Sequence, residues 1–349
     1  MPRHLASVRT IDKIDPIEGA DRIERATIGA WPVVVPKGAF APGDKCVYFE
    51  IDSALDVSRP QFAFLAQRSV KHWTELDESG EHIIKREGHV LRTARMRGQI
   101  SQGLAMTLAE SGVPEDTPVG TDVTDLLGVT KYDPYIPAST GTSRRIGGYP
   151  SAYCIRSDAE RAQNLADMWS TLSAYVWYPT EKVDGTSSTI IADKDDGHLR
   201  VASRNLEVAW YDEEPRVKAA IEYGLDKVLT PGMAIQFELV GPSINSNRLG
   251  LAKQRPIVFG VWQACHPLPR DKWPEACLDN AAPILDLAFP DSAEGALAQV
   301  FGMKSHISPE RMAEGVVWHT TDGSQVPGLD YRDCFKAVND KYLLKYESK

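Results

Sequence analysis

The chain has 349 residues, 42% of them hydrophobic and 25% charged, and carries a net charge of −9 at pH 7. This length and composition are typical of a globular protein with roughly two or three domains. No segment approaches the roughly 18 consecutive apolar residues of a membrane-spanning helix. The negative charge argues against nucleic-acid binding through the charge of the whole surface. Five scattered cysteines without a C-x-x-C pair predict neither a disulfide framework nor a structural zinc site.

The N-terminal residues 1–9 are polar, so we expect no secretory signal. Since no membrane span is expected either, we expect a cytoplasmic protein without a membrane partner. We also expect a monomer. Next come β-rich segments broken by Gly and Pro turns, at Ile28–Val35, Cys46–Ile51 and Val90–Leu108. Short strands without a long helix predict an OB-like β-barrel over residues 1–128. Such barrels often bind single strands or nucleic-acid backbones.

Within that domain, Arg92, Arg95 and Arg97 lie in a basic stretch, although the whole protein is acidic. A local basic stripe can hold phosphates, so these arginines are candidate nucleic-acid contacts. The alternative is a solvated strand edge that charge protects from pairing.

Residues 129–150 are rich in Pro, Gly, Ser and Thr, which predicts a linker before a second domain at 151–349. In that domain we expect a helix with Asp158 as its N-cap and Leu165, Trp169 and Leu172 on one face. The other predicted elements are strands at Tyr175–Tyr178, Met233–Val240, Ile257–Trp262, Gly315–Trp318 and Cys334–Val338, a hairpin of Thr186–Ala192 with His198–Arg204, a helix capped by Asp212 with Ile221, Leu225 and Val228 inward, and a short helix from Ser308.

A lysine in a tight, acid-flanked turn follows the first of these strands, in Glu181–Gly185 (Glu-Lys-Val-Asp-Gly). Lysine attacks phosphorus only as the neutral amine, so a nucleophilic Lys182 needs a lowered pKa. Burial or neighbouring cations lower a lysine pKa. The alternative is a solvated Asp-Gly turn with a surface lysine.

The order of these pieces resembles the covalent nucleotidyltransferase superfamily and, more narrowly, the Deinococcus-type, nick-sealing RNA ligase family. The resemblance covers nearly the whole chain, and the segments that carry it are 12–22, 33–38, 47–53, 92–103, 158–164 and 181–185. It implies an α+β fold, in which an OB-like β-barrel precedes a nucleotidyltransferase (ATP-grasp-like adenylyltransferase) domain of antiparallel sheets and helices. Few residues follow Lys341, so we expect no C-terminal OB domain, which favours an RNA ligase over a DNA ligase.

The resemblance implies that Lys182 attacks the α-phosphorus of ATP and forms lysyl-AMP. AMP then passes to a 5′-phosphate end, and a 3′-hydroxyl displaces it to seal a nick in an RNA or RNA/DNA duplex. ATP is expected with Mg²⁺ or Mn²⁺, because the attacked phosphate needs its charge neutralised.

The resemblance also assigns roles around the nucleotide. Glu181 accepts from the adenine amino group, and Arg204 contacts ribose or phosphate. Glu238 holds the ribose hydroxyls, unless strand alternation turns it to solvent. Phe259 stacks on adenine, unless it is simple core.

Four further positions complete the expected site. Asp184 orients Lys182 or a metal-bound water, and Glu314 binds the metal. Lys336 grips the α-phosphate. RNA ligases commonly carry K-x-K here, whereas this chain has Val338 at the second place and Lys341 further on, also as a candidate nucleotide contact.

Two other functions stay open on these residues. One is an ATP-dependent ligase that acts on DNA. The other is a non-catalytic RNA-binding protein with a degenerate nucleotidyltransferase domain.

Overall fold

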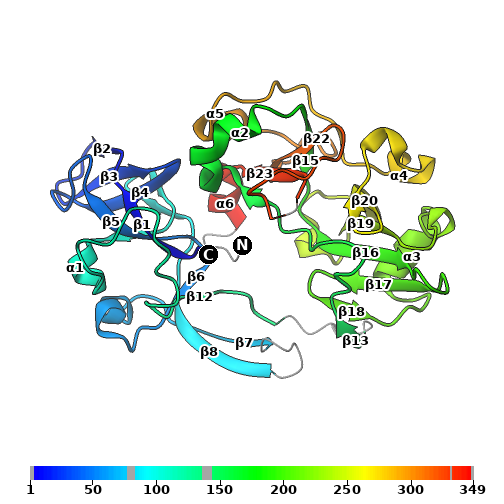
Figure 1. The fold of residues 1–349 in the computed structure, drawn as a ribbon, viewed down its shortest axis with the longest axis horizontal. Helices are drawn as coiled ribbons and strands as arrows, with labels where there is room; N and C mark the ends of the chain where they lie inside the picture. Colours follow the sequence, from blue (N-terminus) through cyan, green and yellow to red (C-terminus); the bar gives the residue numbers. More distant parts are fainter. Residues whose placement is uncertain (1–3, 77–82, 136–143, 331, 347–349) are drawn as a thin grey trace. The chain divides into compact units, whose positions relative to one another are not determined.

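The computed structural model describes residues 4–76, 83–135, 144–330 and 332–346. The chain forms two compact units (Figure 1): Met1–Ile136 with Leu343–Lys349, and Pro137–Tyr342. No helix among the described residues has the length and hydrophobicity needed to cross a membrane. None of the five cysteines forms a disulfide, as their scattered positions predict.

The first unit consists mainly of short antiparallel strands. Its hydrogen-bonded sheets are β1 (Ala6–Thr10), β5 (Lys45–Phe49) and β11 (Leu104–Met106); β2 (Lys13–Pro16), β3 (Ile23–Ile28) and β4 (Trp31–Pro36); β9 (Ala94–Met96) and β10 (Gln99–Ser101); and β12 (Thr130–Lys131), β6 (Ser53–Leu55), β8 (Ile83–Val90) and β7 (Lys71–Leu76). Strand β5 is buried on both faces, because Val47 and Phe49 enter one core while Cys46 and Tyr48 enter another. Two cores therefore share this central strand.

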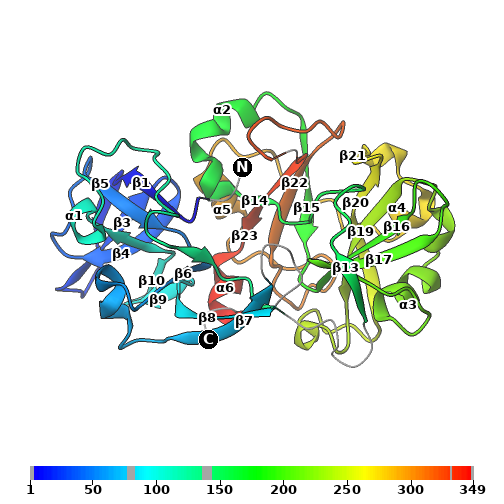
Figure 2. The ribbon, with the colours of Figure 1, turned by 60° about the horizontal axis from the view of Figure 1, so that its bottom comes forward.

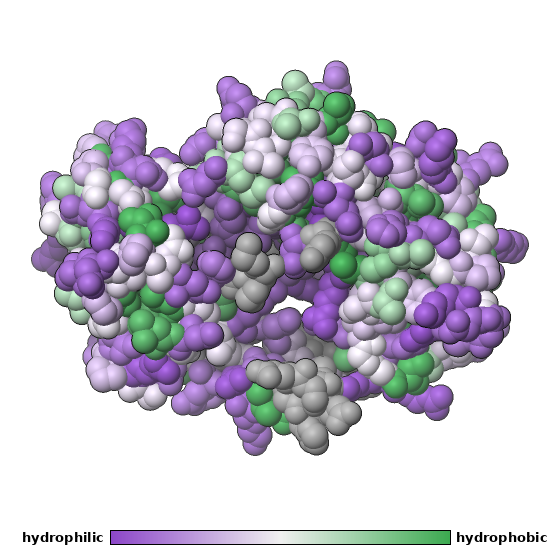
Figure 3. Space-filling view, in the orientation of Figure 1, coloured by the Kyte–Doolittle hydropathy of each residue, from purple (hydrophilic) through white to green (hydrophobic). Residues whose placement is uncertain are grey.

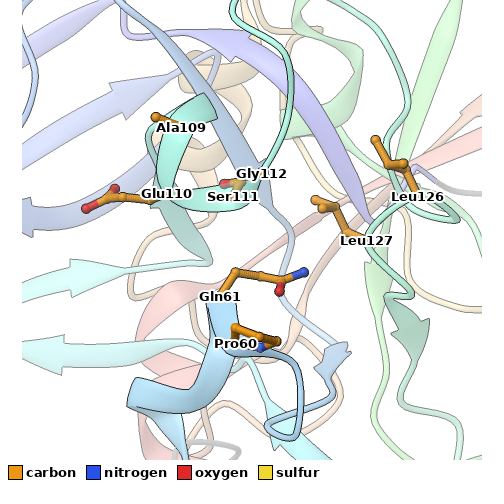
Figure 4. A pocket seen from close by; sticks show the side chains of 8 residues that line it. All are labelled: Pro60, Gln61, Ala109, Glu110, Ser111, Gly112, Leu126 and Leu127. Atoms are coloured by element: carbon orange, nitrogen blue, oxygen red, sulfur yellow. The ribbon is translucent and has the colours of Figure 1, made fainter.

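Two short helical segments of the first unit border a shallow depression of about 490 Å³ (Figure 4). They are η1 (Pro60–Leu65) and α1 (Leu108–Ser111), and Thr107 with Glu110 forms a capping box at the start of α1. The other lining residues are Gly112, Leu126 and Leu127. None of the site residues expected from the sequence lines this depression.

The second unit contains two sheets and several short helices (Figures 1 and 2). The larger sheet runs β13 (Arg145–Gly148), β18 (Leu206–Val208), β17 (Leu199–Ser203), β16 (Thr186–Ala192), β19 (Met233–Val240), β20 (Arg255–Gln263) and β21 (His266–Pro267), with antiparallel neighbours throughout. The smaller sheet runs β14 (Glu160–Arg161), β23 (Cys334–Val338), β22 (Gly315–Thr320) and β15 (Trp177–Lys182), with β14 parallel to β23. The helices are η2 (Ala162–Met168), α2 (Trp169–Leu172), α3 (Pro215–Glu222), η3 (Asp226–Val228), η4 (Asn245–Asn247), η5 (Arg270–Lys272), α4 (Glu275–Asp279) and α5 (Ala293–Val300). Helix α6 (Asp340–Tyr346) begins in this unit, and its residues from Leu343 on belong to the first unit.

An aromatic cluster covers one face of the smaller sheet. Trp177, Trp318 and Phe335 project from its three neighbouring strands, and Phe289 and Trp169 pack on them with ring centroids 5.1–6.2 Å apart. Since side chains alternate along a strand, Lys182 of β15 lies on the opposite face from Trp177. The aromatic face is thus the structural side of this sheet.

Several sequence-based expectations for the helices are wrong. Asp158 does not cap a helix, because β14 intervenes and η2 begins only at Ala162, although Leu165, Trp169 and Leu172 are buried as expected. Helix α3 is capped by Glu214, whose carboxylate accepts from the backbone N–H groups of two residues in its first turn, instead of by Asp212.

Two more helix expectations fail for local reasons. Ile221 is 39% exposed, because α3 buries the stripe of Val217 and Ala220 instead. Ser308 begins a turn and not a helix; the helix of this region is α5, where the Ser292 hydroxyl accepts from the N–H of Gly295.

Figure 3 shows polar side chains over most of the visible surface of both units, with hydrophobic residues in scattered patches. Single exposed apolar side chains, such as Val176 at 71% exposure, are ordinary on protein surfaces.

The pairing of β22 with β23 leaves no room for a side chain at Gly315, where an added Cβ would overlap the Ala337 carbonyl oxygen and lie 3.0 Å from Val338 Cα. We expect Gly315→Ala to lower the free energy of unfolding by about 1–3 kcal/mol, the usual cost of overpacking. Urea unfolding measures the change. Gly148→Ala is the matched control, because its Cβ meets no atom within 4 Å; equal losses in both variants would contradict the packing argument.

Candidate active site

Strand register places Lys182 and Lys336 on one face of the smaller sheet. Lys182 is the last residue of β15 and pairs with Gly315 of β22, while Lys336 of β23 pairs with Val317. Because Val317 also pairs with Thr180, the two lysines stand in neighbouring rows of the same face. The lysine therefore ends a strand, and the turn that the sequence predicted around it begins only at Val183.

The Lys182 ammonium forms an ion pair with Glu314, with 2.6 Å between Nζ and Oε1. Burial lowers the pKa of Lys182, but the attraction of Glu314, aided by Glu238 and Asp184, outweighs it and raises the pKa above the ordinary 10.5. The expected lowering of this pKa is thus wrong, because the neighbouring carboxylates outweigh the effect of burial. A neutral amine requires that this negative charge be compensated.

Glu238 comes from the larger sheet, at the end of β19 that faces the turn after Lys182. Its Oε1 accepts from the N–H of Gly185 at 3.1 Å. Burial, helped by the charges of Glu314 and Asp184 and opposed by Lys182, raises the pKa of Glu238 to about 8. Glu238 therefore holds a proton at neutral pH, and its carboxyl group does not simply point to solvent.

Asp184 is held by three side chains that the sequence analysis did not single out. Its Oδ1 accepts from Asn245 Nδ2 at 2.8 Å, and its Oδ2 accepts from Arg248 Nη1 at 2.5 Å and from the Tyr342 hydroxyl. Asn245 and Arg248 belong to a polar, Ser/Asn-rich run directly after the Gly241-Pro242 turn. A polar run directly after a buried strand is typical of a functional loop, so this run is the sequence signal from which Asn245 and Arg248 could have been found.

Asp158 joins two of the cations expected from the sequence. It lies 3.2 Å from Lys336 Nζ and 3.2 Å from Arg204 Nη2. Burial lowers the pKa of Lys336 to about 8, although Asp158 opposes the change. Arg161, beside Lys336 across the β14–β23 pair, adds to the lowering through its positive charge.

Glu181 lies on the other face of β15 from Lys182. It is 2% exposed, and its Oε2 accepts from the backbone N–H groups of His306 at 2.7 Å and Ile307 at 3.3 Å. Burial raises the pKa of Glu181, although these hydrogen bonds oppose the change. The carboxylate is thus fastened to the 305–307 backbone.

Phe259 is the extra residue of a β-bulge, because Gln236 pairs with Gly260 while Phe237 pairs with Val258. Its side chain is only partly buried, and it is not among the buried core residues. A half-exposed ring on the strand next to Glu238 suits stacking better than core packing.

The structure does not bring Lys341 into this cluster: its Nζ lies 4.5 Å from the centroid of the exposed Phe301 ring. Val338, at the position where the K-x-K pattern has its second lysine, is 3% exposed and pairs with Gly315. Strand β23 thus supplies Lys336 as its only lysine.

The candidate nucleic-acid contacts all belong to the first unit. Arg95 is exposed on β9, and Arg97 is exposed in the turn to β10 with a φ of 48°. Arg92 is half-buried, with its guanidinium carbon 5.4 Å from the centroid of the Tyr132 ring.

The carboxylates around Lys182 offer oxygen donors for a divalent cation. Glu314 Oε2 is buried and has no hydrogen-bond partner among the described residues, so it keeps a lone pair for a cation. Asp184 and Glu238 add oxygen donors, the ligand type that magnesium and manganese prefer. Asp184, Glu238 and Glu314 are not among the described sets of three metal-ligating side chains whose ligand atoms all lie within 4.8 Å of one another. Those sets are His319 with Asp333 and Cys334, and Asp193 with Asp196 and His198.

Comparisons with known proteins agree with this architecture. An OB-fold domain model matches residues 5–108, and an RNA ligase model matches residues 176–338. A mutant of Naegleria gruberi RNA ligase with ATP and Mn is 30% identical and superimposes with a TM-score of 0.81, covering 99% of this chain and 100% of that chain. The same ligase as a mutant with AMP and Mn (TM-score 0.82) and with PPi (TM-score 0.80) is also 30% identical over 99% of this chain and 100% of each matched chain. No curated protein sequence matches significantly.

The protein therefore has an α+β fold in which an OB-fold domain precedes an RNA ligase nucleotidyltransferase domain, as the sequence predicted. The chain belongs to the RNA ligase family.

The opposite pKa shifts of the two lysines predict opposite reactivities. At pH 8, without nucleotide or metal, an amine-acylating reagent should modify Lys336 faster than Lys182, because Lys336 is about half neutral while Lys182 remains an ammonium ion. Their side chains are similarly accessible, at 15% and 23%, so the difference reports charge. Peptide mass spectrometry measures both rates.

Glu314→Gln should accelerate the modification of Lys182 by roughly tenfold or more, because a lost charge-assisted partner shifts a pKa by about one unit or more. The exposed Glu294→Gln is the matched control. An unchanged Lys182 rate in Glu314→Gln would contradict the ion-pair explanation.

Proposed function

We propose that this ATP-dependent RNA ligase is of the Deinococcus type and seals nicks through an AMP adduct on Lys182. The observation that carries the proposal is the convergence of Lys182, Glu314, Glu238 and Asp184 where the ends of β15 and β19 meet. A lysine amine among carboxylates that can take up cations fits a nucleophile for phosphorus. The ATP and Mn present with the N. gruberi ligase support the same assignment.

In the first step, Nζ of Lys182 attacks the α-phosphorus of ATP, a P–N bond forms, and the P–O bond to pyrophosphate breaks. The ammonium must lose a proton first, and Glu314 Oε1 at 2.6 Å is the nearest acceptor placed to take it. A divalent cation at Glu314 and Asp184 would neutralise the phosphate charge and offset the negative charge that holds this proton.

The other residues are proposed to bind and orient the nucleotide. Lys336 holds the α-phosphate and offsets the charge that develops there. Arg204, which shares Asp158 with Lys336, contacts ribose or phosphate, and Glu238 receives the ribose hydroxyls. The half-exposed Phe259 stacks on adenine.

Glu181 is proposed as the adenine contact through Oε1, which is buried and has no partner among the described residues. An adenine amino group would satisfy this oxygen. Lys341 stays the weakest of the sequence-based assignments, because its ammonium packs on Phe301.

Transfer of AMP to a 5′-phosphate and attack of a 3′-hydroxyl then join the strands, with the same residues stabilising each in-line transfer. We propose that residues 1–128 hold a nicked RNA or RNA/DNA duplex, with 129–150 as the link to the catalytic domain at 151–349.

Incubation with α-labelled ATP and Mn²⁺ should label the native protein, and Lys182→Ala and Lys182→Arg should lose the label entirely. Arginine keeps the positive charge but has no neutral form, so it cannot attack. Mass spectrometry should place the AMP on residue 182. Lys227→Arg, at an exposed position, is the control; label that persists in Lys182→Arg would sink the lysyl-AMP proposal.

The exposed arginines of the first unit should affect joining but not adenylylation. We expect the double variant Arg95→Ala with Arg97→Ala to lower the slope of log affinity against log salt for a nicked duplex by roughly two, about one per lost phosphate contact. Lysine adenylylation should stay unchanged. Lys13→Ala removes one exposed charge from the same unit as a control; a salt slope equal to that of the native protein would rule out these contacts.

A further inference from the structure

The segment Ser243–Arg248 follows β19 and has an unusual backbone. Its residues with positive φ are Ser243 (68°), Asn245 (41°), Ser246 (59°) and Asn247 (47°). Residues other than glycine rarely adopt this left-handed region, and asparagine is among those that tolerate it best. Such backbone persists only where the surrounding structure determines it, which is most common at functional sites.

Polar contacts at both ends hold the segment in this form. The Asn247 amide accepts from the N–H of Leu251 at 3.0 Å and donates to its carbonyl at 2.9 Å. Gln254 Nε2 donates to the Pro242 carbonyl at 2.8 Å. The result is that Asn245 donates both to Asp184 Oδ1 at 2.8 Å and to the Gly185 carbonyl at 2.5 Å.

Arg248 and Tyr342 meet on the other oxygen of Asp184. Arg248 Nη1 lies 2.5 Å from Oδ2, and the Tyr342 hydroxyl donates to the same atom. Arg248 Nη1 also donates to the Tyr342 oxygen at 3.2 Å, and its guanidinium carbon lies 5.7 Å from the ring centroid. The two donors thus support each other as well as the carboxylate.

This arrangement is buried and asymmetric. Tyr342 is 2% exposed, and the Asp184 side chain is 14% exposed. Oδ2 receives two donors whereas Oδ1 receives one, so Oδ1 keeps the greater capacity to accept from a ligand. Asp184 follows Lys182 by two residues, in the turn whose Gly185 N–H donates to Glu238, so its carboxylate belongs to the same cluster as Lys182.

We propose that Arg248 and Tyr342 are positioning residues for the ligase reaction: they hold Asp184 by Oδ2, while Asn245 fixes the turn, so that Oδ1 stays directed to the reacting centre. The inference rests on the proposed role of Lys182 as nucleophile. Preorganised second partners of this kind set the orientation of a catalytic carboxylate before substrate arrives.

The kinetic test compares Tyr342→Phe, Arg248→Ala and Arg248→Lys in single-turnover adenylylation of the full chain. Tyr342→Phe and Arg248→Ala should lower the maximal rate about 10- to 100-fold, the factor for a lost hydrogen bond to a charged group. The ATP concentration at half-maximal rate should stay within about twofold, because neither residue contacts ATP in this proposal. Arg248→Lys keeps the charge and one donor and should recover part of the rate. Tyr223→Phe is the control, because its hydroxyl donates to the Gln254 carbonyl at 3.5 Å and lies beside Lys253, away from Asp184.

A second readout needs no activity. Urea midpoints of Tyr342→Phe, Asp184→Ala and the double variant, without metal or nucleotide, form a cycle that measures the coupling of the two side chains. We expect the double variant to lose less stability than the sum of the single variants. Additive losses, or a Tyr342→Phe rate within twofold of the native rate, would overturn the proposal.

The lysine variants keep the two proposals apart. Label that persists in Lys182→Arg refutes the nucleophile, whatever Tyr342 does. Native rates in Tyr342→Phe and Arg248→Ala, with label lost in Lys182→Arg, refute only the positioning role.

Discussion

The ion pair of Lys182 with Glu314 is the interaction around which the other groups of the candidate site are arranged. A largely buried ammonium beside one carboxylate is stable because the two charges balance, and Asp184 adds further negative charge beside them. Glu238 retains a proton up to a pH of about 8, which reduces that excess. At neutral pH the site therefore holds protons on both Lys182 and Glu238. In the mechanism we propose, positive charge that enters with the nucleotide releases them.

Strand pairing brings the side chains of this site together from distant parts of the chain. Lys182 and Lys336 share a face because β15, β22 and β23 pair in one register, and a slip of one residue would turn either lysine into the aromatic core. Gly315 protects that register, since it is the point where the strands approach too closely for a side chain. The short parallel strand β14 then places Arg161 beside Lys336.

Much of the second unit could be predicted from local sequence. The bounds of β16, β19 and β23 agree with the expected Thr186–Ala192, Met233–Val240 and Cys334–Val338, because β-branched and aromatic residues between turn formers define buried strands well. The OB-fold and the RNA ligase family are likewise confirmed. These features depend on neighbours in sequence or on motifs that extend over the whole chain.

What could not be predicted depends on partners far away in the chain. Burial of Lys182 was foreseeable, but the direction of its pKa shift is decided by Glu314. Tyr342 and Arg248 are far from Asp184 in the sequence, so their contacts with it could not be predicted. The left-handed backbone around Asn245 could not be predicted either, because none of its positive-φ residues is a glycine. Short helices such as α5 also escaped, because a one- or two-turn helix is stabilised by its tertiary contacts more than by its own sequence.

The anchoring of Glu181 has a mechanical consequence. Its carboxylate couples the strand that ends in the nucleophile to the 305–307 backbone, and β22 begins a few residues later, directly after Glu314. Lys182 and its counter-ion Glu314 are thus held by connected pieces of backbone, because β15 pairs with β22 and is also tied to residues 305–307. In the mechanism we propose, any rearrangement between the successive phosphoryl transfers therefore falls to Lys336 and Arg204, which share the partly exposed carboxylate of Asp158.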